Sequence, residues 1–238
     1  MIAENKVDIL FLVEGAKKAE GLVVVIDVFR AFSLEAYLFD MGAIAIMAVE
    51  TLEDAFQLKQ KTDNSLLIGE RCGKKCEGFD YGNSPSLIER KFVEGKNIIH
   101  TTSSGTRGLL NVNHADELMA GSLVNARAIA DYILKKSPER VSLVCMGDAS
   151  KSPAEEDVLC AQYIKYLITG NNDQDYKKKI QNLKNTSGSK FFDAHLQEIY
   201  PERDFWMCTN CNIFPFVLIA NKEKIGMSIK RKWIKDIQ

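Results

Sequence analysis

Short apolar runs rich in β-branched residues recur along the chain, and amphipathic or polar stretches separate them. Runs of this kind are typical of buried parallel strands. Because helical patterns fall between most of them, the sequence predicts an α/β fold: a three-layer α/β/α sandwich with a mostly parallel or mixed central sheet. The expected strands lie near residues 7–12, 22–27, 43–49, 65–69, 97–101, 116–120, 141–146 and 213–220.

Hydroxyl residues at the starts of amphipathic stretches predict where several helices begin. The strongest signal is Ser152-Pro153-Ala154-Glu155, which combines an N-cap, an early proline and a capping-box acid before a run to Leu167. Three further signals follow the same logic. They are Thr51 with Asp54 for a helix to about Thr62, Ser84-Pro85, and Ser122 before the stretch 123–136.

Chain length leaves the number of domains open, since 238 residues can form one large domain or two small ones. Composition shifts after Gly170, where residues 171–190 become polar around a lysine-rich centre. We interpret 171–190 as a surface connection and predict a single α/β domain over residues 1–238. Pro215 predicts that the strand at 213–220 lies at a sheet edge or contains a bulge.

Composition is that of an ordinary globular protein, with 46% hydrophobic and 26% charged residues and a net charge of −1. A near-neutral charge argues against a nucleic-acid surface, which usually carries a basic excess. No apolar stretch approaches the roughly 20 residues of a membrane span, and residues 1–6 lack the layout of a signal peptide. We therefore expect a cytoplasmic protein with reduced thiols that binds neither nucleic acid nor membrane.

Four of the expected strands end in clusters of acidic, arginine and hydroxyl residues. In open α/β sheets ligands bind outside the carboxyl ends of strands, so we expect all four clusters to face one crevice. Carboxylates that can hold a metal, beside arginines that can hold an anion, indicate phosphoryl chemistry. The clusters are Asp27 with Arg30, Gly69-Glu70-Arg71, the segment 101–107, and Gly147-Asp148.

Asp27 is the first candidate metal ligand, because a carboxylate at a strand end suits Mg²⁺, which prefers hard oxygen ligands. The alternative is an acid that only terminates a strand. We favour function because charges adjoining buried strands are rarely incidental. Glu156 and Asp157 could add a second carboxylate, but the helix dipole alone favours acids in a first helical turn. Asp148 allows the same two interpretations.

The segment Thr101-Thr102-Ser103-Ser104-Gly105-Thr106-Arg107 is the part of the chain best suited to an oxyanion. A strand, a hydroxyl-rich turn and a helix start bring amides, hydroxyls and a guanidinium together. Ordinary capping is the alternative, and we favour anion binding because position and composition agree. The glycine-rich loop from Gly69 to Gly82 would let backbone approach a ligand closely, and Ser84 follows it.

Several familiar phosphate-handling motifs are missing from the sequence. It contains no Cys-x5-Arg phosphatase loop, and Phe29 stands where the second acid of an Asp-x-Asp motif would be. Gly73 and Gly78 have P-loop spacing, but Phe79-Asp80 replaces the Lys-Ser/Thr pair. These absences exclude cysteine phosphatases, Asp-x-Asp phosphatases and P-loop ATPases.

Six segments in chain order match motifs of a known family. They are Val25-Ile26-Asp27-Val28-Phe29-Arg30-Ala31, Gly69-Glu70-Arg71, Gly78-Phe79-Asp80-Tyr81-Gly82-Asn83-Ser84-Pro85, Thr101-Thr102-Ser103-Ser104-Gly105-Thr106-Arg107, Ala120-Gly121-Ser122-Leu123-Val124-Asn125-Ala126 and Glu156-Asp157-Val158. Together they resemble the 2-phosphosulfolactate phosphatase family over about residues 20 to 165. Several motifs in order are far more specific than any one of them.

The resemblance implies a phosphatase-like domain that performs Mg²⁺-dependent hydrolysis of 2-phospho-3-sulfolactate to 3-sulfolactate and phosphate, a step in coenzyme M biosynthesis in archaea. We expect a small anionic phosphomonoester as the partner, and a homo-oligomer is compatible with the sequence. We hypothesise that Asp27, with Glu70 or Asp157, holds Mg²⁺, that Asp27 and Glu70 act in catalysis, and that Asp80 transfers a proton. The substrate-binding candidates are Arg30, Arg71, Asn83, Ser84, Thr102, Ser103, Ser104, Gly105, Thr106 and Arg107.

Two alternatives stay open. The chain could be a phosphatase for another small 2-phospho-carboxylate, such as phosphoglycolate or phospholactate. It could also be a non-catalytic binder of phosphorylated or sulfonated carboxylic acids, which would need the arginines and hydroxyls but not metal ligands. Asp27 and Glu70 favour catalysis.

Overall fold

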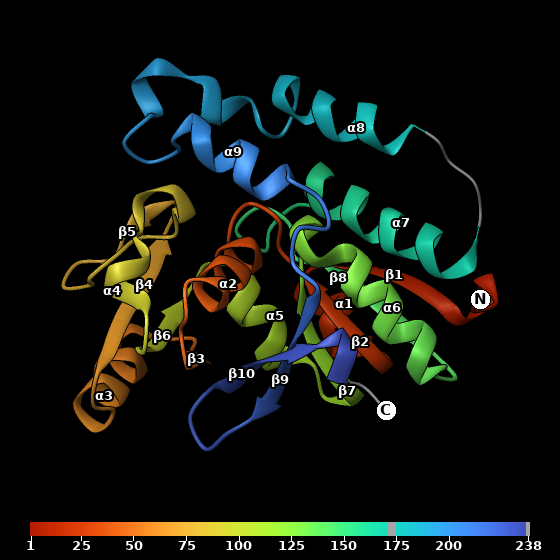
Figure 1. Ribbon diagram of the computed structural model, residues 1–238, viewed down its shortest axis with the longest axis horizontal. Coiled ribbons are helices and arrows are strands. Elements are labelled where there is room, and N and C mark those ends of the chain that lie inside the picture. The colour runs from red at the N-terminus through yellow and green to blue at the C-terminus, as the bar shows by residue number, and fades with distance from the viewer. Residues whose placement is uncertain (171–174, 237–238) are drawn as a thin grey trace.

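The computed structural model describes residues 1–170 and 175–236, and a mixed sheet of ten strands forms the centre of this part of the chain (Figure 1). The predicted α/β sandwich is confirmed. The strands are β1 (Val7–Phe11), β2 (Glu20–Ile26), β3 (Ala45–Ala48), β4 (Ser65–Arg71), β5 (Lys74–Lys75), β6 (Asn97–Thr101), β7 (His114–Gly121), β8 (Val141–Cys145), β9 (Phe216–Lys222) and β10 (Met227–Trp233). The α-helices are α1 (Leu12–Lys18), α2 (Ala31–Asp40), α3 (Leu52–Lys61), α4 (Arg90–Val93), α5 (Gly105–Asn111), α6 (Ala126–Lys136), α7 (Glu155–Thr169), α8 (Tyr176–Asn182) and α9 (Glu202–Thr209).

The sheet consists of two parallel groups joined by an antiparallel hairpin. Its strands pair in the order β1-β8-β2-β7-β9-β10-β3-β6-β4-β5. β1, β8, β2 and β7 form one parallel group, and β3, β6 and β4 form the other. Three antiparallel pairings, which involve β9 and β10, connect the groups. By pairing direction alone, the two groups therefore run in opposite senses.

Sheet twist brings the carboxyl ends of the two groups back together. Neighbouring strands rotate by roughly 20–25° each, so the six steps from β2 to β4 accumulate roughly 130°. The sheet curls round α2 and α5, which lie between the two groups in Figure 1. Phe32 of α2 and Leu109 of α5 share one hydrophobic core with Val25 of β2 and Ile98 of β6. Strands that are distant in pairing order thus end near a common point.

Helices also cover the outer faces of the sheet. Along β2, Val23 and Val25 belong to the core of α2, whereas Val24 and Ile26 belong to a second core with α6 and α7. This alternation is the period-two pattern of a strand that is buried on both faces. α3 packs on the outer face of β4 and β6.

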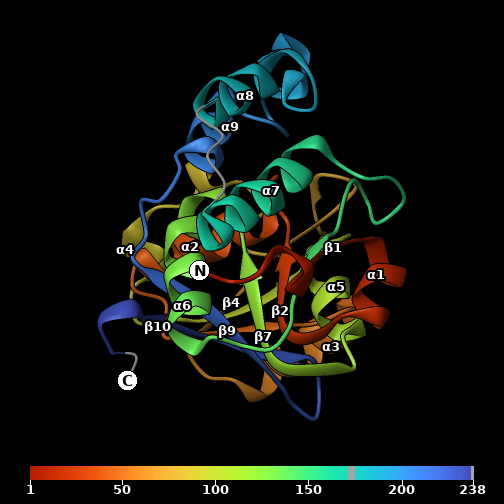
Figure 2. The same cartoon turned by 90° about the vertical axis from the view of Figure 1, so that its right-hand side faces the viewer.

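The chain after α7 forms a further layer, which we call the cap (residues 175–212). In Figures 1 and 2, α8 and α9 lie across the top of the molecule, away from the curled sheet. Leu183, Phe191 and Phe205 of the cap are buried and join the core of α6 and α7. The lysine-rich region that we interpreted as a surface connection therefore includes helix α8. Residues 171–174 of that prediction lie outside the described residues.

Two predicted helix starts are confirmed. The Thr51 hydroxyl accepts the Asp54 N–H at 3.0 Å and opens α3. Ser122 precedes a 3₁₀ turn over Leu123–Asn125 that continues into α6, and the Asn125 side chain accepts the Ser122 N–H at 3.1 Å. At Thr51 the N-cap side chain accepts an N–H of the first helical turn, and at Ser122 the Asn125 side chain accepts the N–H of the N-cap residue itself.

Two predicted helix starts are wrong, because tertiary contacts use the same residues differently. Ser84-Pro85 opens only the 3₁₀ turn Pro85–Leu87, and the Ser84 hydroxyl donates to Asp204 of the cap at 2.9 Å. The helix predicted to run to Leu167 is present as α7, but it begins at Glu155 after Ala154, without a side-chain cap. Ser152, the predicted N-cap, instead pairs with Asp148 in an isolated β-bridge.

The sheet also differs from the prediction at its centre. β9 starts at Phe216, after Pro215, and lies between β7 and β10, so the expected edge position is wrong. β10 was not expected, because Lys230, Arg231 and Lys232 interrupt its apolar pattern. Among the described helices, none has the length and apolar character needed to cross a membrane.

Candidate active site

A cavity of about 320 Å³ lies where strands from both parallel groups end. Asp27 follows β2, Glu70 is near the end of β4, Ser103 follows β6 and Gly147 follows β8. All four residues line this cavity, so the prediction that these strand ends face one crevice is confirmed. Residues from α7 and from the cap complete the lining.

Asp27 is a buried carboxylate at the entry to α2, and its side chain is held there by the backbone. Its Oδ1 accepts the Ala31 N–H at 3.1 Å. Burial raises the pKa of Asp27 to about 7, and the negative charges of Glu70 and Glu156 add to this rise. A cation in the cavity would therefore interact strongly with this group, because it relieves both the desolvation and the repulsion.

Glu70 ties two loops of the second parallel group together. Its Oε1 accepts the Ser103 N–H at 2.6 Å, and its Oε2 accepts the Gly73 N–H at 2.7 Å and the Ser103 hydroxyl at 3.2 Å. These bonds join the turn between β4 and β5 to the turn after β6. Hydrogen bonds to an ionised acceptor are among the stronger ones, so Glu70 fixes the position of Ser103 beside the cavity.

Asp157 connects two loops of the first parallel group in the same way. Its Oδ1 accepts the Val28 N–H and its Oδ2 accepts the Gly147 N–H, both at 2.8 Å. Burial, together with the nearby Asp27 and Glu156, raises the pKa of Asp157 well above its usual range. Asp157 therefore joins the loop after β2 to the loop after β8.

Glu156 faces the cavity from the first turn of α7. It differs from Glu70 and Asp157, whose carboxylates hold loops through backbone N–H groups. It is buried, and its Oε2 has no hydrogen-bond partner. Burial raises the pKa of Glu156. A buried oxygen without a donor costs free energy unless a ligand or ion completes its contacts. The sequence allowed Glu156 either as a second metal carboxylate or as an acid favoured by the helix dipole, and the structure places it in the lining of the cavity.

The donor set fits Mg²⁺ through two carboxylates. Across residues 1–170 and 175–236, no three His, Cys, Asp or Glu side chains are already gathered as metal ligands. Mg²⁺ commonly uses only one or two protein carboxylates and completes its shell with water and phosphate. Asp27 and Glu156 suit this role, because both line the cavity with raised pKa values and Glu156 has an unpartnered oxygen. Glu70 and Asp157, predicted as ligands, already use both oxygens on protein donors.

Arg30 lines the cavity, but its charge is balanced within the protein. Its NH1 donates to Asp204 of the cap at 2.7 Å and to the Ile199 carbonyl at 2.8 Å. The guanidinium carbon lies 4.9 Å from the centre of the Tyr200 ring. The side chains of Arg30 and Asp204 are 2% and 0% exposed, respectively. Arg30 therefore connects the loop after β2 to the cap as well as facing the cavity.

The cap contributes two cavity residues that sequence reasoning did not single out, Lys190 and Tyr200. Among the described residues, Lys190 and Arg30 are the only lysine or arginine side chains that line the cavity. The Lys190 ammonium lies 5.1 Å from the centre of the Tyr200 ring, a cation–π distance. Burial raises the pKa of Tyr200. No local motif marks these residues in the sequence.

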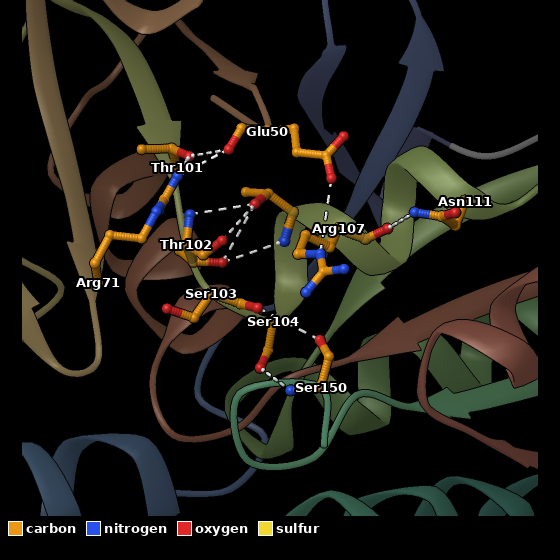
Figure 3. Close-up of polar contacts among 10 residues, drawn as sticks. Glu50, Arg71, Thr101, Thr102, Ser103, Ser104, Arg107, Asn111 and Ser150 are labelled. Carbon is orange, nitrogen blue, oxygen red and sulfur yellow. Dashed lines mark hydrogen bonds and ion pairs between the residues drawn. The ribbon is translucent and has the colours of Figure 1, made fainter. Parts of the chain in front are cut away.

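Two predicted anion-binding arginines, Arg71 and Arg107, do not line the cavity. Figure 3 shows both beside Glu50. Arg71 donates to the Thr101 hydroxyl at 2.9 Å and to the Glu50 carbonyl at 2.8 Å. Arg107 has its Nε 3.7 Å from a carboxylate oxygen of Glu50, and its side chain is 44% exposed. The structure therefore does not bring Arg71 or Arg107 to Asp27, and both contact Glu50 instead.

Other predicted site residues support the loops rather than line the cavity. Asp80 Oδ2 accepts the Leu67 N–H at 2.8 Å and pairs with Lys59 at 3.7 Å, away from the cavity. Thr102 and Thr106 are buried, and the Thr106 hydroxyl donates to the Thr102 carbonyl at 3.1 Å.

Gly105 packs behind Asp27. A Cβ at Gly105 would lie 3.0 Å from the Asp27 Oδ2, so a glycine leaves room for this carboxylate. Ser84, as described above, bonds to the cap.

Three predicted substrate-binding residues face the cavity with defined contacts. They are Ser103, which Glu70 holds, Ser104 and Asn83. The Ser104 hydroxyl donates to the Gly147 carbonyl at 3.0 Å. It also accepts the Ser150 N–H at 2.9 Å, a contact that Figure 3 shows. The Asn83 side chain contacts the buried His100. Together with Arg30, these are the predicted substrate ligands that the structure places at the cavity.

Comparison with known proteins yields one consistent description. A family model described as 2-phosphosulpholactate phosphatase matches residues 10–223. Three similar relatives carry the name "Probable 2-phosphosulfolactate phosphatase". One from Carboxydothermus hydrogenoformans is 43% identical over 164 residues, which cover 68% of this chain and 67% of that protein. One from Bacillus subtilis is 32% identical over 211 residues, 87% of this chain and 90% of that protein. One from Pseudothermotoga lettingae is 33% identical over 226 residues, which cover 92% of this chain and 97% of that protein.

Proposed function

This chain belongs to the 2-phosphosulpholactate phosphatase family, and we propose that it is a Mg²⁺-dependent phosphatase that hydrolyses 2-phospho-3-sulfolactate to 3-sulfolactate and phosphate. One observation carries the proposal beyond family membership. Buried carboxylates from the strand ends and cationic side chains adjoining the cap line the same cavity. This arrangement suits a substrate whose phosphoryl group needs a metal and whose other end carries further anionic groups.

Asp27 and Glu156 are the residues that we assign to the metal. When bound, Mg²⁺ supplies charge neutralisation at the phosphoryl oxygens and a more acidic water molecule. Asp27 and Glu156 would hold it from the first parallel group and from α7. Glu70 and Asp157 keep the surrounding loops in place through backbone N–H groups. Replacing Glu70 or Asp157 would therefore disturb the site by displacing its loops, and not by removing a metal ligand.

Donors around the cavity suit the substrate's oxygens. Asn83, Ser103 and Ser104 reach the cavity from the second parallel group and its following loops. We assign the Asn83 amide to the phosphoryl group, because a side-chain amide can donate to an anionic oxygen. The Ser103 and Ser104 hydroxyls already donate to Glu70 and to the Gly147 carbonyl, so these serines shape the cavity wall around it. We assign Lys190 to the sulfonate or carboxylate, because it lines the cavity from the cap and carries a charge.

The reaction itself breaks the bond between phosphorus and the C2 oxygen, with water as the final acceptor of the phosphoryl group. Attack by water and attack by a carboxylate such as Asp27 differ in the order in which the products appear. Direct attack by water releases 3-sulfolactate and phosphate in the same step. Attack by Asp27 releases 3-sulfolactate first and leaves an acyl phosphate on the protein, which a second, hydrolytic step converts to phosphate and free Asp27. A single turnover that follows both products therefore separates the two routes.

A phosphate-release panel tests the proposal. The compounds are 2-phospho-3-sulfolactate, phosphoglycolate, phospholactate and a phosphomonoester without a second anion, each with Mg²⁺ and with EDTA. We expect turnover that requires Mg²⁺ and is fastest for 2-phospho-3-sulfolactate. A matched pair of variants removes one negative charge each: Asp27→Asn in the cavity, and Glu155→Gln on the exposed side of the same helix start that carries Glu156. Only the first should abolish turnover.

The panel also separates the alternatives. If the protein prefers phosphoglycolate or phospholactate, the proposed substrate is wrong but the proposed phosphomonoester hydrolysis still holds. Tight binding of the sulfonated compound without phosphate release under any condition would indicate a non-catalytic binder and refute the proposed hydrolysis.

A further inference from the structure

A chain of three buried polar side chains runs from α2 to the cavity. Glu35 of α2 lies 2.8 Å (Oε1) from the Nδ1 of His100 on β6, and the His100 Nε2 lies 2.9 Å from the Asn83 Oδ1. Glu35 and His100 are 0% exposed, and Asn83 is 5% exposed. Of the three, only Asn83 lines the cavity. Glu35 and His100 are connected to the cavity through Asn83.

The direction of the hydrogen bonds in this chain is set by chemistry. The Asn83 Oδ1 has no proton, so the His100 Nε2 must carry the one that they share. Two states of the pair at Glu35 satisfy this condition. Either neutral Glu35 donates to the His100 Nδ1, or a doubly protonated His100 donates to a Glu35 carboxylate. In both states the His100 Nε2–H donates to Asn83, and the Nδ2 group of Asn83 is left for the cavity.

We propose that Glu35 and His100 are positioning residues, which fix the Asn83 amide so that its N–H group donates to an oxygen of the phosphoryl group bound in the cavity. The inference rests on the proposed function, because it names the substrate group that Asn83 contacts. The inference depends on the orientation of the Asn83 side-chain amide. A reversed amide would present an oxygen lone pair to an anionic ligand and turn an attraction into a repulsion.

The composition of the cavity explains why this orientation needs support. Five acids line it, against two basic side chains, Arg30 and Lys190; the acids are Asp27, Glu70, Asp148, Glu156 and Asp157. An amide without a fixed partner could turn its N–H toward one of these acids. Burial of Glu35 also has a cost, since its Oε2 has no hydrogen-bond partner and burial raises its pKa. An apolar side chain would fill this place in the core without that cost, which favours a role in orienting His100.

Nitrogen NMR of the wild-type protein tests the direction of the chain without any activity measurement. The sequence contains three histidines, so ¹⁵N-histidine labelling gives few signals, and the absence of one in His100→Phe assigns His100. We expect its Nε2 to carry a proton, whether or not Nδ1 also does. A His100 with a bare Nε2 and a protonated Nδ1 would refute the proposal, because the Asn83 oxygen would then face the cavity.

Substitutions at Glu35 test the consequence for binding. Glu35→Gln can still donate to the His100 Nδ1 and so keep the proton on Nε2, whereas Glu35→Leu leaves Nδ1 without a partner. We expect Glu35→Leu to raise KM and the Kd for inorganic phosphate about five- to tenfold, as for one lost hydrogen bond, with kcat within about twofold. Glu35→Gln should restore both constants to within about twofold of wild type.

A purely structural role predicts a different pattern. It would lower Tm and the active fraction of Glu35→Leu but leave KM and phosphate affinity unchanged in the folded protein. That result, or a failure of Glu35→Gln to rescue, would overturn the inference. Phosphate binding keeps the test separate from the proposed function. A protein that binds phosphate in a Glu35-dependent way but releases none from any phosphomonoester would retain the positioning role and refute the phosphatase.

Discussion

Replacing Asp27 with Asn should make the protein more stable while it abolishes the proposed activity. The carboxylate is buried among other acids, and its pKa is about 7 in place of 3.8. An asparagine has nearly the same shape and can still accept the Ala31 N–H through its Oδ1. The substitution therefore removes a charge that the fold disfavours and keeps the hydrogen bond at the start of α2.

The expected gain follows from the difference between the two pKa values. A rise of about 3 units, at 1.36 kcal/mol per unit, corresponds to about 4 kcal/mol of stability that wild type lacks once Asp27 is ionised. Between pH 4 and pH 7 the unfolded chain has lost this proton while the native protein keeps it. Wild-type stability therefore falls across this window as pH rises. The advantage of Asp27→Asn should be greatest at pH 8 and disappear below pH 4.

Urea denaturation in EDTA measures this difference, since a bound metal would stabilise wild type by mass action. At pH 8 a gain of about 4 kcal/mol corresponds to a rise in Tm of roughly 10 °C for a chain of this size. Glu155→Gln is the control, because it removes a negative charge from an exposed position nearby and should change stability by less than about 0.5 kcal/mol. Equal or lower stability of Asp27→Asn at pH 8 would refute the view that Asp27 is a disfavoured buried charge.

Three other substitutions test separate parts of the site. Glu156→Gln should weaken Mg²⁺ binding about tenfold or more in calorimetry, because a neutral amide is a poorer metal ligand; unchanged affinity would remove Glu156 from the metal site. Lys190→Met should raise KM about tenfold for 2-phospho-3-sulfolactate but not for a phosphomonoester without a second anion; equal effects on both would contradict its assignment. Asp204→Ala should lower the free energy of unfolding by about 3–5 kcal/mol, because it leaves Arg30 buried without its partner; a change under 1 kcal/mol would show that the pair is not needed.

The sequence predicted the position of the site better than its chemistry. Apolar runs located the strands, and the rule that ligands bind at their carboxyl ends placed Asp27, Glu70, Ser103 and Gly147 together. That rule succeeded although the two parallel groups run in opposite senses by pairing. Twist brought their ends together, and no local pattern reports an accumulated twist.

Roles within the cluster could not be predicted, because a carboxylate at a strand end serves equally as a metal ligand or as a loop clamp. Asp157 and Glu156 are neighbours in one helical turn and were equivalent by periodicity. In the structure one accepts two backbone N–H groups and the other has an unpartnered oxygen. Similarly, Arg71 and Arg107 have the composition of an anion site, but both contact Glu50, which carried no signal in the sequence.

The cap could not be predicted from local patterns, yet its contacts explain how it is coupled to the strand ends. Asp204 accepts from Arg30 in the loop after β2 and from Ser84 after β5, so one cap carboxylate holds both parallel groups. Lys190 enters the cavity from the same cap. Loss of Asp204 should therefore displace Lys190 as well as destabilise the fold. The Asp204→Ala variant should lose the preference for a second anion on the substrate under conditions in which it is still folded, as judged by circular dichroism. Retained preference in the folded variant would show that the cap is positioned by its apolar contacts alone.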